Sequence, residues 1–129
     1  MGVMSKVLIV DDQPEIRRLW QVNLAARSYD VVVAADGREC LEKVESERPD
    51  IILLDLSMPV LSGGAVLEAL KGSAAVKNTA VVVLTGWADE EVHRQARQMG
   101  ATGALVKPFG IDELLVSMEL AAREVALKE

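Results

Sequence analysis

Residues 51–55 read Ile-Ile-Leu-Leu-Asp, four apolar residues followed at once by an aspartate. A short apolar run without alternation is typical of a strand that is buried on both faces of a parallel sheet. Four further runs are predicted to be strands, at Lys6–Val10, Val31–Ala35, Ala80–Leu84 and Ala104–Val106. Helical stretches separate these runs, so the sequence predicts an α/β fold with a doubly wound, five-stranded parallel sheet.

Five helices are expected around this sheet, at Pro14–Arg27, Arg38–Glu47, Gly64–Leu70, Asp89–Met99 and Ile111–Leu127. Pro14 suits a helix start, where its missing N–H costs nothing, and Gly100 suits a helix end. The first helix has a stripe that is predicted to face the core, made of Ile16, Leu19, Trp20 and Leu24. Residues 71–78 are small and polar and predict a surface loop.

Length and composition describe one ordinary globular domain, which we expect to span residues 1–129. Half of the residues (50%) are hydrophobic and 26% are charged, which excludes a disordered chain. The net charge of −6 would repel a phosphate backbone, so direct nucleic-acid binding is not expected. The sequence has no membrane-length apolar run and no signal peptide, so we expect no membrane contact and a cytoplasmic location.

The last helix carries two apolar stripes. The first, which should face the sheet, consists of Ile111, Leu114, Leu115, Met118, Ala121, Ala122 and Val125. Val116, Leu120 and Leu127 lie on the opposite side of the helix. This second stripe is either a set of scattered exposed aliphatics or a contact surface for a second copy or an output segment.

Three carboxylates follow two of the predicted strands. Asp11 and Asp12 end the first strand, and Asp55 ends the third. Taken singly, each aspartate is explained by a cap or a turn. Together they lie at the carboxyl edge of the sheet, where open α/β sheets bind ligands, and their mutual repulsion calls for a proton or a cation. One cysteine and one histidine offer no plausible zinc site, so a hard ion such as Mg²⁺ fits best.

Two further side chains are predicted at the same edge. Thr85 ends the fourth strand and supplies a hydroxyl, and Lys107 ends the fifth and supplies an ammonium. A carboxylate nucleophile beside a divalent cation, a hydroxyl and a lysine is a suitable set for accepting a phosphoryl group.

The motifs at these strand ends are Val10-Asp11-Asp12, Leu53–Pro59, Leu84-Thr85-Gly86 and Val106–Phe109. In this order, over nearly the whole chain, they resemble the receiver domain of bacterial two-component response regulators. The resemblance implies a flavodoxin-like sheet with strand order 2-1-3-4-5. It also implies a signalling domain that catalyses its own phosphorylation and loses the phosphoryl group slowly, and not an enzyme.

The resemblance implies a role for each motif residue. Asp55 matches the acceptor of a phosphoryl group from a sensor histidine kinase or phosphotransfer protein. Asp12 matches the position that ligates Mg²⁺ directly, Asp11 the one that acts through water, and Ser57 a ligand through its backbone carbonyl. Thr85 matches a hydroxyl that moves to the bound phosphoryl group, and Lys107 the cation that pairs with it.

Three further positions are implied by the same resemblance. Pro108 matches a position with a cis peptide bond. Met58-Pro59 and Gly63 match the loop that follows the acceptor.

The chain departs from the family at strand five. Receivers often carry an aromatic residue where this sequence has Ala104, so an aromatic switch there is impossible. Trp87 is either a reporter of the phosphoryl group that restricts attacking water or an exposed loop aromatic. We expect His93 on a solvated helix face, Cys40 as a small core residue and Phe109 packed at the start of the last helix.

Three other functions fit the sequence less well. A phosphatase that turns over an aspartyl phosphate often carries an acid two residues after the nucleophile, but that residue is Ser57. A flavin or dinucleotide binder needs a glycine-rich or hydroxyl-rich loop after strand one, whereas residues 11–14 read Asp-Asp-Gln-Pro. A degenerate receiver that binds partners without phosphorylation is disfavoured because the set of site residues is complete.

Overall fold

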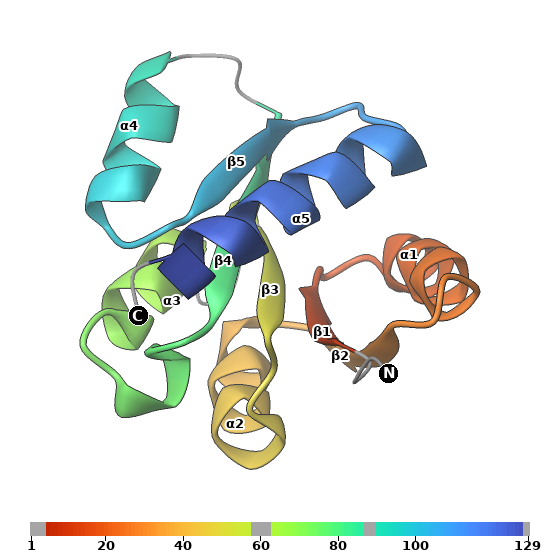
Figure 1. Cartoon of the computed structure of the whole chain (residues 1–129), viewed down its shortest axis with the longest axis horizontal. Coiled ribbons are helices and arrows are strands. Elements are labelled where there is room, and N and C mark those ends of the chain that lie inside the picture. Colours follow the sequence, from red (N-terminus) through yellow and green to blue (C-terminus); the bar gives the residue numbers. More distant parts are fainter. Residues whose placement is uncertain (1–4, 58–62, 87–89, 128–129) are drawn as a thin grey trace.

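Five parallel strands form one sheet in this computed structural model, which describes residues 5–57, 63–86 and 90–127. The strands are β1 (Lys6–Val10), β2 (Asp30–Ala34), β3 (Ile51–Asp55), β4 (Ala80–Thr85) and β5 (Gly103–Val106). Their order across the sheet is β2-β1-β3-β4-β5, and each neighbouring pair is parallel. The predicted fold class and strand order are therefore confirmed (Figure 1).

Helices cover both faces of the sheet. They are α1 (Pro14–Ala25), α2 (Gly37–Glu47), α3 (Gly63–Leu70), α4 (Glu90–Gln98) and α5 (Ile111–Leu127). Buried side chains of α1 and α5 pack on one face, and those of α2, α3 and α4 pack on the other. Figure 1 shows α5 crossing the front of the sheet. Within the described residues, no helix has the length and apolar character needed to cross a membrane.

The central strands explain why the apolar runs lack alternation. In β1, Leu8 and Val10 belong to the core under α2 and α3, whereas Val7 and Ile9 belong to the core under α1 and α5. All residues of β3 and β4 are buried. A strand with a hydrophobic layer on each face must be apolar at every position, which is the pattern of residues 51–54.

Strand β2 lies one residue earlier than the predicted range. Asp30 joins the ladder because its backbone N–H donates to the carbonyl of Ser5 at 3.0 Å. Ala35 leaves it because its N–H donates instead to Oε1 of Glu39 at 2.6 Å. Asp36 then caps α2 by accepting a bond from the backbone N–H of Glu39 at 2.8 Å. The polar side chains that cap the N-terminus of α2 thus also end this strand.

The predicted inward stripe of α1 is wrong at one position. Leu24 is fully buried and Trp20 is half-buried, but the side chain of Leu19 is 49% exposed. The helix covers only the β1–β2 end of the sheet, so it buries a narrower stripe than its apolar pattern suggests. The apolar side chain of Leu19 therefore remains at the surface.

Two other predicted features are resolved by the structure. The segment 71–78 is not wholly loop, because a 3-10 turn covers Ala74–Val76 after Ser73, whose hydroxyl accepts a bond from the N–H of Ala75. On α5, the predicted inner stripe is buried or half-buried, and the outer residues are exposed. Gly100 follows α4 with a φ of 103°, the left-handed conformation that suits its predicted role as a helix stop.

Candidate functional site

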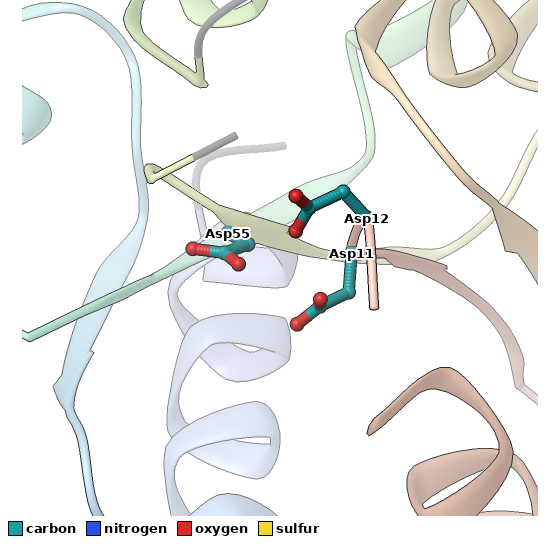
Figure 2. A group of neighbouring side chains, drawn as sticks. All are labelled: Asp11, Asp12 and Asp55. Atoms are coloured by element: carbon teal, nitrogen blue, oxygen red, sulfur yellow. The ribbon is translucent and has the colours of Figure 1, made fainter. Parts of the chain in front are cut away.

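The structure brings together the three carboxylates that the sequence places at strand ends. Asp11 and Asp12 directly follow β1, and Asp55 is the last residue of β3. These strands are neighbours, with Val10 opposite Leu54. Each aspartate offers a carboxylate oxygen that lies within 4.8 Å of those of the other two. Figure 2 shows the three side chains around one gap.

Asp11 is the carboxylate whose environment favours the neutral form. Its side chain is buried at the sheet edge, whereas Asp12 is exposed. Burial raises the pKa of Asp11, and the charges of Asp55 and Asp12 raise it further, against a lowering hydrogen bond from the N–H of Gln13. A cation bound between these carboxylates would offset their mutual repulsion and stabilise the ionised form of Asp11.

Asp55 is buried but remains ionised because it has three hydrogen-bond or charge partners. The backbone N–H and the hydroxyl of Ser57 donate to Oδ1 of Asp55 at 2.9 and 2.6 Å. Nζ of Lys107 lies 3.2 Å from Oδ2. Burial alone would raise the pKa of Asp55, but the bonds from Ser57 and the charge of Lys107 outweigh it, so this pKa lies below its ordinary value.

Thr85 ends β4 and Lys107 directly follows β5, at the same edge of the sheet. The backbone N–H of Lys107 donates to the carbonyl of Thr85 at 2.7 Å, and Thr85 is 1% exposed. Asp55 is paired with Leu84, so Thr85 lies one residue beyond the partner of Asp55 in the ladder. The bond between Lys107 and Pro108 is cis, as the sequence resemblance implies.

Two contacts of Asp11 were not predicted. The N–H of Gln13 donates to Oδ1 of Asp11 at 2.9 Å, and Nη1 of Arg17 donates to the carbonyl of Asp11 at 2.8 Å. The first is an Asx turn, which an aspartate two residues ahead of the helix N-cap, Gln13, could have suggested. The second depends on how far the Arg17 side chain reaches back along α1, for which the sequence has no local signal.

Of the remaining residues singled out in the sequence, those that the structure describes lie outside this cluster of carboxylates. Cys40 is fully buried, and burial raises its pKa to about 12, as suits a core residue. His93 is half-buried, so the prediction of a solvated side chain was wrong. Its Nε2 atom is enclosed and has no hydrogen-bond partner within the described part of the chain. Trp87, Met58 and Pro59 lie outside the described residues, and Gly63 begins α3.

The donor set decides which ion this site fits. The group offers carboxylate oxygens alone, and no histidine or cysteine joins it among the described residues. Such a set favours a hard divalent cation over zinc or copper. The site therefore combines oxygen ligands, a buried ionised carboxylate and a nearby ammonium.

Known proteins of similar sequence and structure form one group. A family model described as the response regulator receiver domain matches residues 7–119. The transcriptional regulatory protein KdpE of Mycobacterium tuberculosis is 38% identical over 120 residues, which are 93% of this chain and 52% of KdpE. The sporulation initiation phosphotransferase F of Bacillus subtilis is 35% identical over 85% of this chain and 87% of its own length.

A solved structure has the same architecture. The chemotaxis protein CheY4 of Vibrio cholerae superposes with a TM-score of 0.87 at 38% identity, covering 92% of this chain and 99% of that chain. The chain spans about half the length of KdpE, but nearly all of CheY4. With the family model matched across residues 7–119, this chain belongs to the response regulator receiver domains, which are phosphorylation-dependent signalling domains.

Proposed function

We propose that Asp55 accepts a phosphoryl group and thereby switches the surface that this domain presents to a partner. The observation that carries the proposal is the environment of its carboxylate, which is buried, ionised and held between Ser57 and Lys107. A carboxylate oxygen attacks phosphorus, and the bond from phosphorus to the donor breaks with its electron pair passing to the donor's leaving atom. The product is an acyl phosphate.

Lys107 and Thr85 serve the transferred group. The ammonium of Lys107, 3.2 Å from Oδ2 of Asp55, stands where negative charge accumulates on the phosphoryl oxygens. The hydroxyl of Thr85 is the donor that turns to the phosphoryl group after transfer, because this residue ends the strand next to β3. Positioning and charge neutralisation of this kind are the main demands of phosphoryl transfer.

Mg²⁺ is the ion that these ligands suit. Asp12 and Asp55 would hold it directly, Asp11 through water and Ser57 through its backbone carbonyl. When bound, the ion neutralises charge on the phosphoryl oxygens during transfer. The raised pKa of Asp11 supports this assignment, because neighbouring carboxylates crowd a group that a cation would stabilise.

The donor is a sensor histidine kinase or a phosphotransfer protein. The name of the Bacillus subtilis relative, a phosphotransferase, and the receiver family support such a donor. The domain acts in the cytoplasm. It does not bind nucleic acid directly, because its net charge of −6 repels a phosphate backbone.

The outer stripe of α5 is the contact surface for a second copy or an output segment. Val116 is 56% exposed, Leu120 59% and Leu127 87%. KdpE is named as a transcriptional regulator and is about twice as long as the matched segment, which is consistent with an output region beyond a receiver.

Slow loss of the phosphoryl group follows from Ser57. Aspartyl-phosphate phosphatases often carry a second acid two residues after the nucleophile, whereas here the Ser57 hydroxyl donates to Asp55 at 2.6 Å. The domain is thus a switch with self-catalysed phosphotransfer, and not a phosphatase.

Intact-mass spectrometry after incubation with acetyl phosphate tests this proposal. We expect a gain of one phosphoryl group in the presence of Mg²⁺ and none with EDTA. Asp55→Asn should abolish the gain, and Asp30→Asn, which changes an exposed aspartate at the other edge of the sheet, should retain it.

The other outcomes are distinct. A gain that persists in Asp55→Asn would assign the acceptor elsewhere. No gain in the folded protein, with acetyl phosphate or with a phosphorylated histidine donor, would favour a binding domain that works without phosphorylation. Rapid release of inorganic phosphate would instead indicate an aspartyl-phosphate phosphatase.

A further inference from the structure

A cavity of about 390 Å³ lies beside the phosphoryl-acceptor site. Its lining comes from the start of α1 and from the segment between β5 and α5, and consists of Gln13, Ile16, Trp20, Lys107, Pro108 and Phe109. Lys107 belongs both to this lining and to the ion pair with Asp55. The cavity and the site therefore share one side chain.

Two aromatic rings on the cavity wall are stacked. The centroids of Trp20 and Phe109 are 5.2 Å apart, and their planes differ by 18°. Both rings are half-buried, and both pack against the core between the sheet and the α1/α5 layer. The stack is a direct contact between α1 and the residues that lead into α5, so a displacement of either segment alters the surroundings of the Trp20 indole.

Both sides of the cavity are attached to site carboxylates. On the α1 side, the N–H of Gln13 donates to Oδ1 of Asp11 at 2.9 Å. On the other side, Nζ of Lys107 lies 3.2 Å from Oδ2 of Asp55, and Phe109 follows Lys107 by two residues. The aromatic pair thus lies between two segments that are each held by the acceptor site.

We infer that the Trp20–Phe109 pair reports the phosphorylation state of Asp55. Phosphorylation replaces a carboxylate of charge −1 by a group that carries about −1.5 to −2 and whose oxygens lie one phosphorus atom farther along the side chain. The ammonium of Lys107 follows that charge, and the segment from Lys107 to Phe109 shifts against α1. The face formed by α1 and this segment then differs between the two states.

This inference rests on the proposed function, so the test measures phosphorylation and the aromatic pair in the same sample. The chain has two tryptophans, and Trp87→Phe leaves Trp20 as the only one. This variant is treated with acetyl phosphate and Mg²⁺. Its phosphorylated fraction is read by intact mass, and the emission maximum and acrylamide quenching of Trp20 are recorded in parallel.

Three companion variants carry the Trp87→Phe change as well. Asp55→Asn tests whether Mg²⁺ or acetyl phosphate alone affects the indole. Phe109→Leu removes the stacked ring but keeps an apolar side chain, and Phe109→Tyr keeps the ring. Circular dichroism confirms that each variant is folded.

We expect the emission and quenching of Trp20 to change in proportion to the phosphorylated fraction. The change should be absent in Asp55→Asn, lost in Phe109→Leu and retained in Phe109→Tyr. A full phosphoryl gain with no change at Trp20, or an undiminished change in Phe109→Leu, overturns the inference and leaves the proposed function intact. The absence of any phosphoryl gain, with acetyl phosphate and with a phosphorylated histidine donor, overturns the proposed function, and this inference with it.

Discussion

The Nζ atom of Lys107 lies 3.2 Å from Oδ2 of Asp55, and this ion pair joins β5 to β3 across the intervening strand β4. The Lys107 side chain is 35% exposed and that of Asp55 is 3% exposed, so the pair is partly buried. Its importance is positional, because it fixes a positive charge beside the carboxylate that would receive a phosphoryl group. The site is thus assembled at the ends of four strands, β1, β3, β4 and β5, and not from one loop.

Removing this charge should impair phosphorylation more than folding. We expect Lys107→Met to slow phosphorylation by acetyl phosphate on the order of 10²-fold, the usual effect of losing one charge-stabilising donor. Time courses of intact mass at fixed Mg²⁺ measure the rate. Lys71→Met, which changes an exposed lysine after α3, is the matched control and should have the parental rate. Equal rates in the two variants would exclude a role for the Lys107 ammonium in transfer.

Asp11 should destabilise the fold when no cation is bound. Burial raises its pKa, so the unfolded chain ionises at lower pH than the folded one. The loss of folding free energy caused by Asp11 is therefore absent below pH 3.8, the pKa of this group in the unfolded chain. It grows as the pH rises through the pKa in the folded protein and is constant above it.

Asp11→Asn should accordingly raise the free energy of unfolding at pH 7 in EDTA, with a smaller gain as pH falls towards 4. The asparagine oxygen can still accept the bond from Gln13. Urea titrations at several pH values measure the effect. In Mg²⁺ the wild type should gain more stability than the variant, since ion binding stabilises the folded state. A variant that is less stable than wild type at pH 7 in EDTA would contradict this account.

Cys40 should be inert in the folded protein. Its pKa is raised to about 12 from 9.0 and its side chain is fully buried, so at pH 8 we expect alkylation by iodoacetamide to be about 10³-fold slower than in the unfolded chain, from the thiolate fraction alone. Mass spectrometry with and without urea gives both rates, and the single cysteine makes the labelled mass unambiguous. Fast labelling of the native protein would mean that α2 opens readily.

The outer stripe of α5 should mediate association if it contacts a second copy. We expect Leu120→Lys to weaken self-association about tenfold, because it places a charge in an apolar contact, and to leave phosphorylation intact. Sedimentation velocity over a concentration series measures this. Val22→Lys alters an aliphatic of α1 with similar exposure, 56% against 59%, and serves as the control. Unchanged sedimentation of Leu120→Lys would exclude this surface from self-association.

The strands and the carboxylate cluster could be predicted because each depends on a local pattern. Residues 51–54 are apolar at every position since both faces are covered, and the aspartates directly follow such runs. Parallel strands then place their carboxyl ends at one edge, so Asp11 and Asp55 must approach each other.

The errors arose where tertiary contacts decide. The apolar pattern of α1 does not say that the helix covers only two strands, so Leu19 was assigned to the core although it is half-exposed. Arg17 contacts the carbonyl of Asp11 through a reach that no sequence pattern encodes. His93 follows two glutamates in a polar helix, and only the packing of α4 encloses its Nε2 atom.

The burial of β3 also bears on how fast the backbone amides near Asp55 and near Lys107 exchange with solvent. All five residues of β3 are buried, and the strand lies between β1 and β4, whereas β5 is a half-exposed border strand. Amide hydrogens of central, buried strands exchange with solvent only when the whole domain unfolds. Amide hydrogens of edge strands exchange through local unfolding. We therefore expect slower amide exchange in β3, which carries Asp55, than in β5, which leads into Lys107.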